Sequence, residues 1–115
     1  MAKHERPFIL RRLPMPIPND NIIDGMENML NIASDSTRLK IMYALSDGEK
    51  SVNEIVEAVG ASQSLISHQL AVLKKANLVS TRKEKTWVFY SLADHHVIEL
   101  LHVVNEHVVE ILERE

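Results

Sequence analysis

Two pairs of potential metal ligands mark the C-terminal segment of this 115-residue sequence. Asp94 and His96 stand near its start, and His107 and Glu110 follow about three helical turns later. If the segment is one helix, His96 and His107 lie on nearly the same face, roughly 20° apart, but about 16 Å apart along the axis. A zinc ion lies about 2 Å from each ligand atom. The four side chains therefore cannot bind one ion within one chain.

A second copy of this helix, packed antiparallel to the first, removes that difficulty. Asp94 and His96 of one chain then meet His107 and Glu110 of the other, and a two-fold axis generates two equivalent sites. Two imidazoles and two carboxylates suit a closed, tetrahedral Zn²⁺ site. A single histidine in such a helix is more often a surface or core residue satisfied by hydrogen bonds. The matched pairs on one face favour the metal site.

The apolar surface of the same segment also predicts a partner. Six apolar residues form a stripe and two more extend it towards the ligand face: Val97, Leu101, Val104, Val108, Ile111 and Leu112, with Leu100 and Val103. A helix with so wide an apolar surface needs both its own core and a second chain. We therefore expect a homodimer. His95 and His102 project away from the stripe and are expected to be solvated.

Composition narrows the class of protein. The length suits one domain, and no run of about 18 apolar residues could cross a membrane. In the N-terminal region the longest apolar run is FIL, which is too short for a signal peptide, so we expect a cytoplasmic protein without a membrane partner. The chain has no cysteine, which excludes disulfides and thiolate metal sites.

The distribution of charge is compatible with a nucleic-acid partner, although the net charge is −3. Residues 51–90 carry five basic and three acidic side chains, a local charge of +2. Residues 91–115 carry one basic and six acidic side chains, a local charge of −5. Because contact with phosphates depends on local charge, a weakly basic middle can face DNA while the acidic tail does not.

The order of elements predicts a winged helix-turn-helix. Residues 1–19, with the alternating PMPIP, are expected to form an extended arm, and residues 20–115 a DNA-binding and dimerisation domain. Two helices are followed by SVNE, a capping box that opens a short helix. Gly60 ends that helix and Ser62 caps the next. LVSTR and TWVFYSL then read as a two-stranded hairpin, and a last helix runs from Asp94 toward Glu113. The fold class is mainly α (α+β), with the first and last helices forming the dimer interface.

The start of the second helix of a helix-turn-helix enters the major groove of DNA. The polar residues there can bond to base edges or phosphates, and basic residues further along the helix and at the hairpin tip can contact the backbone. These candidates are Gln63, Ser64, Ser67, His68, Lys74, Lys75, Arg82, Lys83 and Lys85. The packed side of the helix is expected to hold Leu65, Ile66, Leu70 and Leu73. Each polar residue alone could equally be solvated surface, and His68 could be a packing or relay residue, but the ordered arrangement favours DNA binding.

Several stretches resemble the ArsR/SmtB family of metal-responsive winged-helix repressors. They are ASDSTRLKIMYAL, SVNEIVEAVGASQSLISHQLAVLKKANLV and RKEKTWVFYSLADHH, and the resemblance extends from about Ile22 to Glu110. The SmtB- and CzrA-like zinc sensors of this family have the pattern Asp-x-His, ten residues, His, two residues, then His or Glu. Here that pattern falls on Asp94, His96, His107 and Glu110. The resemblance implies Zn²⁺ as the ion, with Co²⁺ or Ni²⁺ as alternatives.

The resemblance also implies the function. Family members that sense arsenic, cadmium or lead use cysteines before the recognition helix, whereas the corresponding stretch here is EKSVNEI, without cysteine. His4 on the arm could donate an extra ligand, as in some nickel-sensing relatives. We expect a homodimeric repressor that binds an inverted repeat of double-stranded operator DNA when metal-free and leaves it on Zn²⁺ binding. The resemblance implies that a ligating histidine, for which His107 is the candidate, relays the change to the recognition helix.

Two other functions are compatible with the sequence. One is a regulator of the same family that responds to nickel, cobalt or a signal other than a metal. The other is an enzyme, because two histidines and a carboxylate can also form an open iron site. We expect no enzyme, since the chain offers neither a second domain nor an obvious substrate cavity, and the ligands would come from two subunits.

Overall fold

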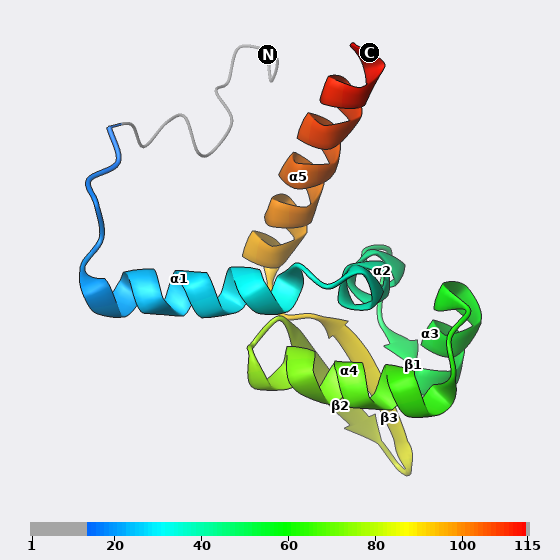
Figure 1. The fold of residues 1–115 in the computed structure, drawn as a ribbon. Helices are drawn as coiled ribbons and strands as arrows, with labels where there is room; N and C mark the ends of the chain where they lie inside the picture. Colours follow the sequence, from blue (N-terminus) through cyan, green and yellow to red (C-terminus); the bar gives the residue numbers. More distant parts are fainter. Residues whose placement is uncertain (1–13, 115) are drawn as a thin grey trace, which may run out of the picture.

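The computed structural model describes residues 14–114. Within this range the structure has five helices and three short strands, and the helices and the β2–β3 hairpin follow the predicted order (Figure 1). They are α1 (Asp20–Ala33), α2 (Ser36–Ala44), β1 (Lys50–Ser51), α3 (Val52–Val59), α4 (Gln63–Lys75), β2 (Val79–Glu84), β3 (Trp87–Leu92) and α5 (His95–Glu113). The predicted winged helix-turn-helix, mainly helical with a small sheet, is confirmed.

Side-chain caps start the helices of the helix-turn-helix where the sequence predicts them. Ser51 Oγ accepts the backbone N–H of Glu54 at 3.3 Å, and the Glu54 carboxylate accepts the backbone N–H of Ser51 at 2.8 Å. Ser62 Oγ accepts the N–H of Leu65 and begins α4. Between the two helices Gly60 adopts φ 79° and ψ 31°, a left-handed conformation that costs glycine little.

The core lies beneath the helix-turn-helix. Its fully buried side chains come from α2, α3, α4 and the residue just before β2: Ile41, Met42, Ile55, Ile66, Leu70, Leu73 and Leu78. One expectation for this layer is wrong, because Leu65 is 39% exposed rather than packed. It lies one residue before Ile66, so helical rotation turns it to the edge of the buried face.

The sheet has three antiparallel strands in the order β1-β3-β2, instead of the expected two. The third strand, β1, has only two residues, and Lys50 and Ser51 pair with Tyr90 and Phe89. A strand of two residues has no alternation to detect, and here it merges with the capping box. The β2–β3 turn lies at Lys85 and Thr86, so Lys85 is at the hairpin tip as expected, whereas Arg82 and Lys83 lie within β2.

The helix α5 stands out from the rest of the chain (Figure 1). Only Val97 and Leu101, in its first two turns, are buried. From residue 102 to 114 every residue of the helix and its cap is exposed. On α1 another group of large apolar side chains is at least one third exposed: Ile22, Ile23, Met26, Met29 and Leu30. Much apolar surface on these two helices is therefore left uncovered by residues 14–114.

The described part of the predicted arm, residues 14–19, contains neither helix nor strand. Ile17 is 90% exposed there. The remaining residues of the arm, 1–13, among them His4, lie outside the described residues.

Candidate metal and DNA-binding surfaces

The first pair of predicted metal ligands lies together at the start of α5. Asp94 is the N-cap, and its Oδ1 accepts the backbone N–H groups of His96 at 2.9 Å and Val97 at 3.3 Å. The same oxygen lies 3.5 Å from Nδ1 of His96. All three contacts use Oδ1 of Asp94, so Oδ2 remains available to bind a metal ion. The two side chains are 54% and 67% exposed.

Electrostatics keep the Asp94 carboxylate ionised. Partial removal from water raises its pKa. The backbone N–H groups of Val97 and His96, together with the nearby His96 imidazole, lower the pKa by a larger amount. The net effect is a pKa below the ordinary value for aspartate. An ionised carboxylate can accept the helix N–H groups and present a negative oxygen to a cation at the same time.

The second pair, His107 and Glu110, lies on the exposed part of α5. The two residues are separated by three positions, so they are neighbours on the helix surface. Glu110 Oε1 accepts a hydrogen bond from Arg114 Nη2 at 2.7 Å, and both side chains are more than 60% exposed. An exposed ion pair of this kind contributes little, so a cation can replace Arg114 at low cost.

The donors of the two pairs fit zinc, but only if two chains contribute. Two imidazole nitrogens and two carboxylate oxygens match the ligands that Zn²⁺ takes in closed tetrahedral sites. Within residues 14–114 of a single chain, no three His, Asp or Glu side chains are grouped so that they could hold a metal ion. The structure brings Asp94 and His96 together, and the helical spacing of three residues places His107 beside Glu110 further along α5.

The other two histidines of the helix are occupied differently. The His95 ring lies against the His96 ring, with centroids 4.2 Å apart. His102 Nε2 lies 3.7 Å from Glu106 Oε2, and both side chains are at least 70% exposed. His102 thus belongs to a polar surface, and it provides a natural comparison for His107.

The predicted base-reading residues of α4 are accessible. Gln63, Ser64, Ser67 and His68 are all exposed in the first two turns. Their polar groups can therefore meet base edges or phosphates without unfolding any part of the chain. Leu65, in the same turn, adds a half-exposed apolar side chain that the sequence interpretation assigned to the core.

The basic residues divide into two groups. Lys74 and Lys75 are exposed in the last turn of α4, and Lys83 and Lys85 are exposed on the wing. None of the four forms a salt bridge within the described part of the chain, so all can turn to phosphates.

Arg82, by contrast, is held within the sheet. Its guanidinium donates to both carboxylate oxygens of Glu49, at 2.6 and 3.2 Å, and to Glu84 at 3.3 Å, and it lies over the ring of Phe89. The Arg82 hydrogen bond in turn lowers the pKa of Glu49. Arg82 would have to give up these contacts to reach DNA, and its position indicates that it braces the wing.

The sequence did not single out two residues of α2, Arg38 and Tyr43, whose hydrogen bonds join helices. Arg38 in α2 donates from Nε to the carbonyl of Ile32 at 2.6 Å and from Nη1 to Oε1 of Gln69 at 2.7 Å. Tyr43, at the end of α2, donates from its hydroxyl to the carbonyl of Leu101 in α5 at 2.6 Å. Arg38 and Gln69 are 31 residues apart in the chain, and Tyr43 and Leu101 are 58 residues apart. No local sequence pattern reveals contacts over such separations.

Comparisons with known proteins define the class. The family model described as "Bacterial regulatory protein, arsR family" matches residues 35–81, which include the whole helix-turn-helix. The chain is 39% identical over 88 residues to the HTH-type transcriptional regulator KmtR of Mycobacterium tuberculosis, covering 76% of this chain and 67% of that protein. It is 38% identical over 85 residues to a transcriptional repressor SmtB homolog of a Synechocystis species, covering 74% of this chain and 64% of the relative.

A solved structure shows the same fold. It is the homodimeric winged helix-turn-helix DNA-binding domain of Mb0332 from Mycobacterium bovis, a possible ArsR-family transcriptional regulator. The TM-score is 0.78 at 29% identity, covering 88% of this chain and 96% of that one.

The fold and the exposed recognition helix define a winged helix-turn-helix regulator of transcription. More particularly, the chain belongs to the arsR family of bacterial regulatory proteins. The alignment spans about two thirds of the length of the two curated relatives. Among residues 14–114 no helix is both long and apolar enough to traverse a lipid bilayer.

Proposed function

We propose that this protein is a homodimeric repressor that binds an inverted repeat in operator DNA when metal-free and leaves it when Zn²⁺ binds between the two α5 helices. Similarity to a transcriptional repressor SmtB homolog supports a role in repression, and the structural neighbour described above is a homodimer. Another relative is named a cadmium resistance regulatory protein CadC homolog from Staphylococcus aureus, which supports a response to metal.

The observation that carries the proposal is the state of α5 beyond Leu101. That part of the helix contributes no buried side chain to the core, and its exposed side chains combine apolar residues with a histidine and a carboxylate. An amphipathic helix of this kind is stable in water when a second surface covers it. An antiparallel second α5 would cover the apolar face and bring His107 and Glu110 of one protomer to Asp94 and His96 of its partner.

In this dimer each residue has a defined task. Asp94 supplies one oxygen while its other oxygen continues to cap the helix, and the two imidazoles supply neutral nitrogens. Glu110 supplies the second carboxylate after releasing Arg114. A zinc ion, when bound, cross-links the two helices and favours one relative position of the two subunits.

Operator binding would use the two recognition helices of the dimer. Gln63, Ser64, Ser67 and His68 would face the major groove, and the four exposed lysines of α4 and the wing would contact phosphates. A metal ion that favours a subunit arrangement with poorly placed recognition helices weakens DNA binding. By linkage, DNA weakens metal binding by the same factor.

The test is a zinc titration of the operator-bound protein. The operator is first selected from a pool of random duplexes by the metal-free protein. Zn²⁺ is expected to release the wild type from this duplex, and His107→Ala is expected to bind it normally without release. His102→Ala is the matched control, because it removes an exposed histidine of the same helix that points elsewhere, and it should respond like the wild type.

Zinc that leaves wild-type operator affinity unchanged would overturn zinc sensing. The same titration with Co²⁺ and Ni²⁺ then decides the second candidate function, a family regulator responding to another metal or to no metal. Failure to select any duplex would overturn DNA binding itself.

A further inference from the structure

The helix α5 is attached to the rest of its own chain by little more than its first two turns. Val97 and Leu101 are its only buried residues. Among the described residues a single side-chain hydrogen bond joins the other helices and strands to α5, the 2.6 Å bond from the Tyr43 hydroxyl to the Leu101 carbonyl. Burial raises the pKa of the Tyr43 phenol, so the hydroxyl retains the proton that it donates.

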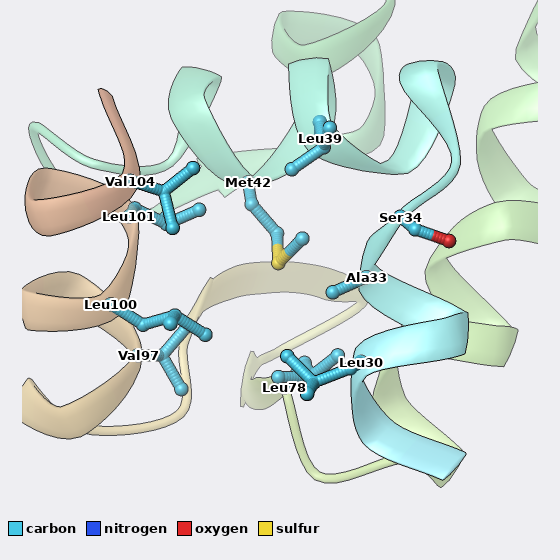
Figure 2. A pocket seen from close by; sticks show the side chains of 10 residues that line it. All are labelled: Leu30, Ala33, Ser34, Leu39, Met42, Leu78, Val97, Leu100, Leu101 and Val104. Atoms are coloured by element: carbon cyan, nitrogen blue, oxygen red, sulfur yellow. The ribbon is translucent and has the colours of Figure 1, made fainter. Parts of the chain in front are cut away.

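The apolar packing around this contact is incomplete. A half-open hollow of about 200 Å³ lies among α1, α2 and α5. Figure 2 shows Leu100 and Val104 of α5 on one side of it and Leu39 and Met42 of α2 on another. Dispersion contacts across such a space are weak and have no preferred direction. The hydrogen bond is directional, so it defines the position of α5 against α2 better than the apolar contacts do.

The same short helix holds the recognition helix at its other end. Arg38 uses Nη1 to bind the side chain of Gln69, in the middle of α4, at 2.7 Å. Its Nε binds the carbonyl of Ile32 in the last turn of α1 at 2.6 Å. Gln69 follows directly after Ser67 and His68, which are exposed for DNA. The planar guanidinium therefore fixes α4 relative to α1 and α2 at the residues next to the reading surface.

Arg38 and Tyr43 are five residues apart, about 7.5 Å along the axis of α2. A helix of nine residues, Ser36–Ala44, is too short to bend appreciably between them. A shift of α5 that pulls on Tyr43 would therefore move Arg38, and with it Gln69.

We propose that α2 is the relay between the dimerisation helix and the recognition helix, with Tyr43 and Arg38 as positioning residues. This inference rests on the proposed function, since it concerns how α5 and α4 influence each other. It assigns the coupling to contacts within one chain, and the route does not pass through a metal-ligating histidine. In α5 the relay begins at the backbone of Leu101, between the two ligand pairs.

The test measures one ratio, the operator affinity without zinc divided by that with zinc. Tyr43→Phe removes only the hydroxyl, and Arg38→Lys keeps the charge but loses the planar pair of donors. Loss of one hydrogen bond is expected to lower the ratio by roughly two- to tenfold in each variant. Ser46→Ala is the matched control, because Ser46 Oγ donates to the Tyr43 carbonyl without reaching α5 or α4, and its ratio should equal that of the wild type.

Zinc affinity without DNA and the melting temperature of the metal-free protein are measured alongside. A purely structural role for Tyr43 would lower the melting temperature and leave the ratio unchanged. If zinc binds and the wild-type ratio is retained by both Tyr43→Phe and Arg38→Lys, the relay is wrong and the proposed function stands. If the wild-type ratio is one, the proposed function fails and the relay fails with it. Should Arg38→Lys not fold, the Tyr43→Phe ratio decides alone.

Discussion

Replacing two exposed valines of α5 should weaken the dimer without unfolding the subunit. Val104 and Val108 are 45% and 46% exposed, so about half of each side chain remains to be covered by a partner. A valine-to-alanine substitution removes about two CH₂ equivalents, whose full burial is worth about 1.6 kcal/mol of hydrophobic free energy. Because only the exposed half of each valine would be buried by the partner, each substitution removes about 0.7 kcal/mol from dimerisation. Two positions in each of two protomers then lose about 3 kcal/mol, which corresponds to a roughly 100-fold weaker dimer.

The assay is analytical ultracentrifugation of Val104→Ala/Val108→Ala across a dilution series. Circular dichroism checks that α5 remains helical, as expected because alanine favours helix more than valine does. The control is His102→Ala/Glu106→Ala, which changes an exposed pair on the polar face of the same helix. A double-valine variant that dissociates at the wild-type concentration, or a control that weakens the dimer as much, would refute the assignment of this face to the dimer.

Three further outcomes are expected from urea unfolding at a fixed protein concentration. Leu70→Ala, at a fully buried position of α4, should lower stability by about 2–5 kcal/mol. Gly60→Ala should cost about 1 kcal/mol through its positive φ alone, because an added Cβ meets no atom within 4 Å; Gly60→Asn should cost less, and equal costs would contradict this explanation. The Glu49–Arg82 pair lowers the pKa of Glu49. It therefore stabilises the fold fully at pH values above the ordinary pKa of 4.5, and this stabilisation is lost as the pH falls below that value and Glu49 takes up a proton. Wild type and Arg82→Ala should therefore differ in urea midpoint at neutral pH and converge in acid, and a constant difference would exclude the pair as the cause.

The helix boundaries could be predicted because their signals are local. Ser51 and Glu54 cap one another across three residues, and Asp94 accepts N–H groups two and three residues ahead. Such contacts form wherever the backbone turns into a helix, whatever surrounds it. The pairing of Asp94 with His96 belongs to the same class, as does the proximity of His107 to Glu110.

Side-chain direction at the edge of a buried face was harder to predict. Leu65 is apolar and adjacent to Ile66, yet it is 39% exposed. The width of the buried stripe depends on how far α2 and α3 extend over α4, which a helical wheel does not contain. Arg82 was assigned to the wing tip for its charge, but Glu49, 33 residues away, engages it.

The sequence by itself determined the order and limits of the helices, the turn at Gly60 and the placement of the four candidate metal ligands in two pairs on α5. These features depend on contacts within about four residues and on the 3.6-residue period. Only the tertiary structure decided that Arg82 braces the sheet, that Arg38 and Tyr43 join α2 to α4 and α5, and that α5 has no buried residue beyond Leu101. Those contacts join residues distant in the chain, and they exist only after the core has packed and brought their elements together.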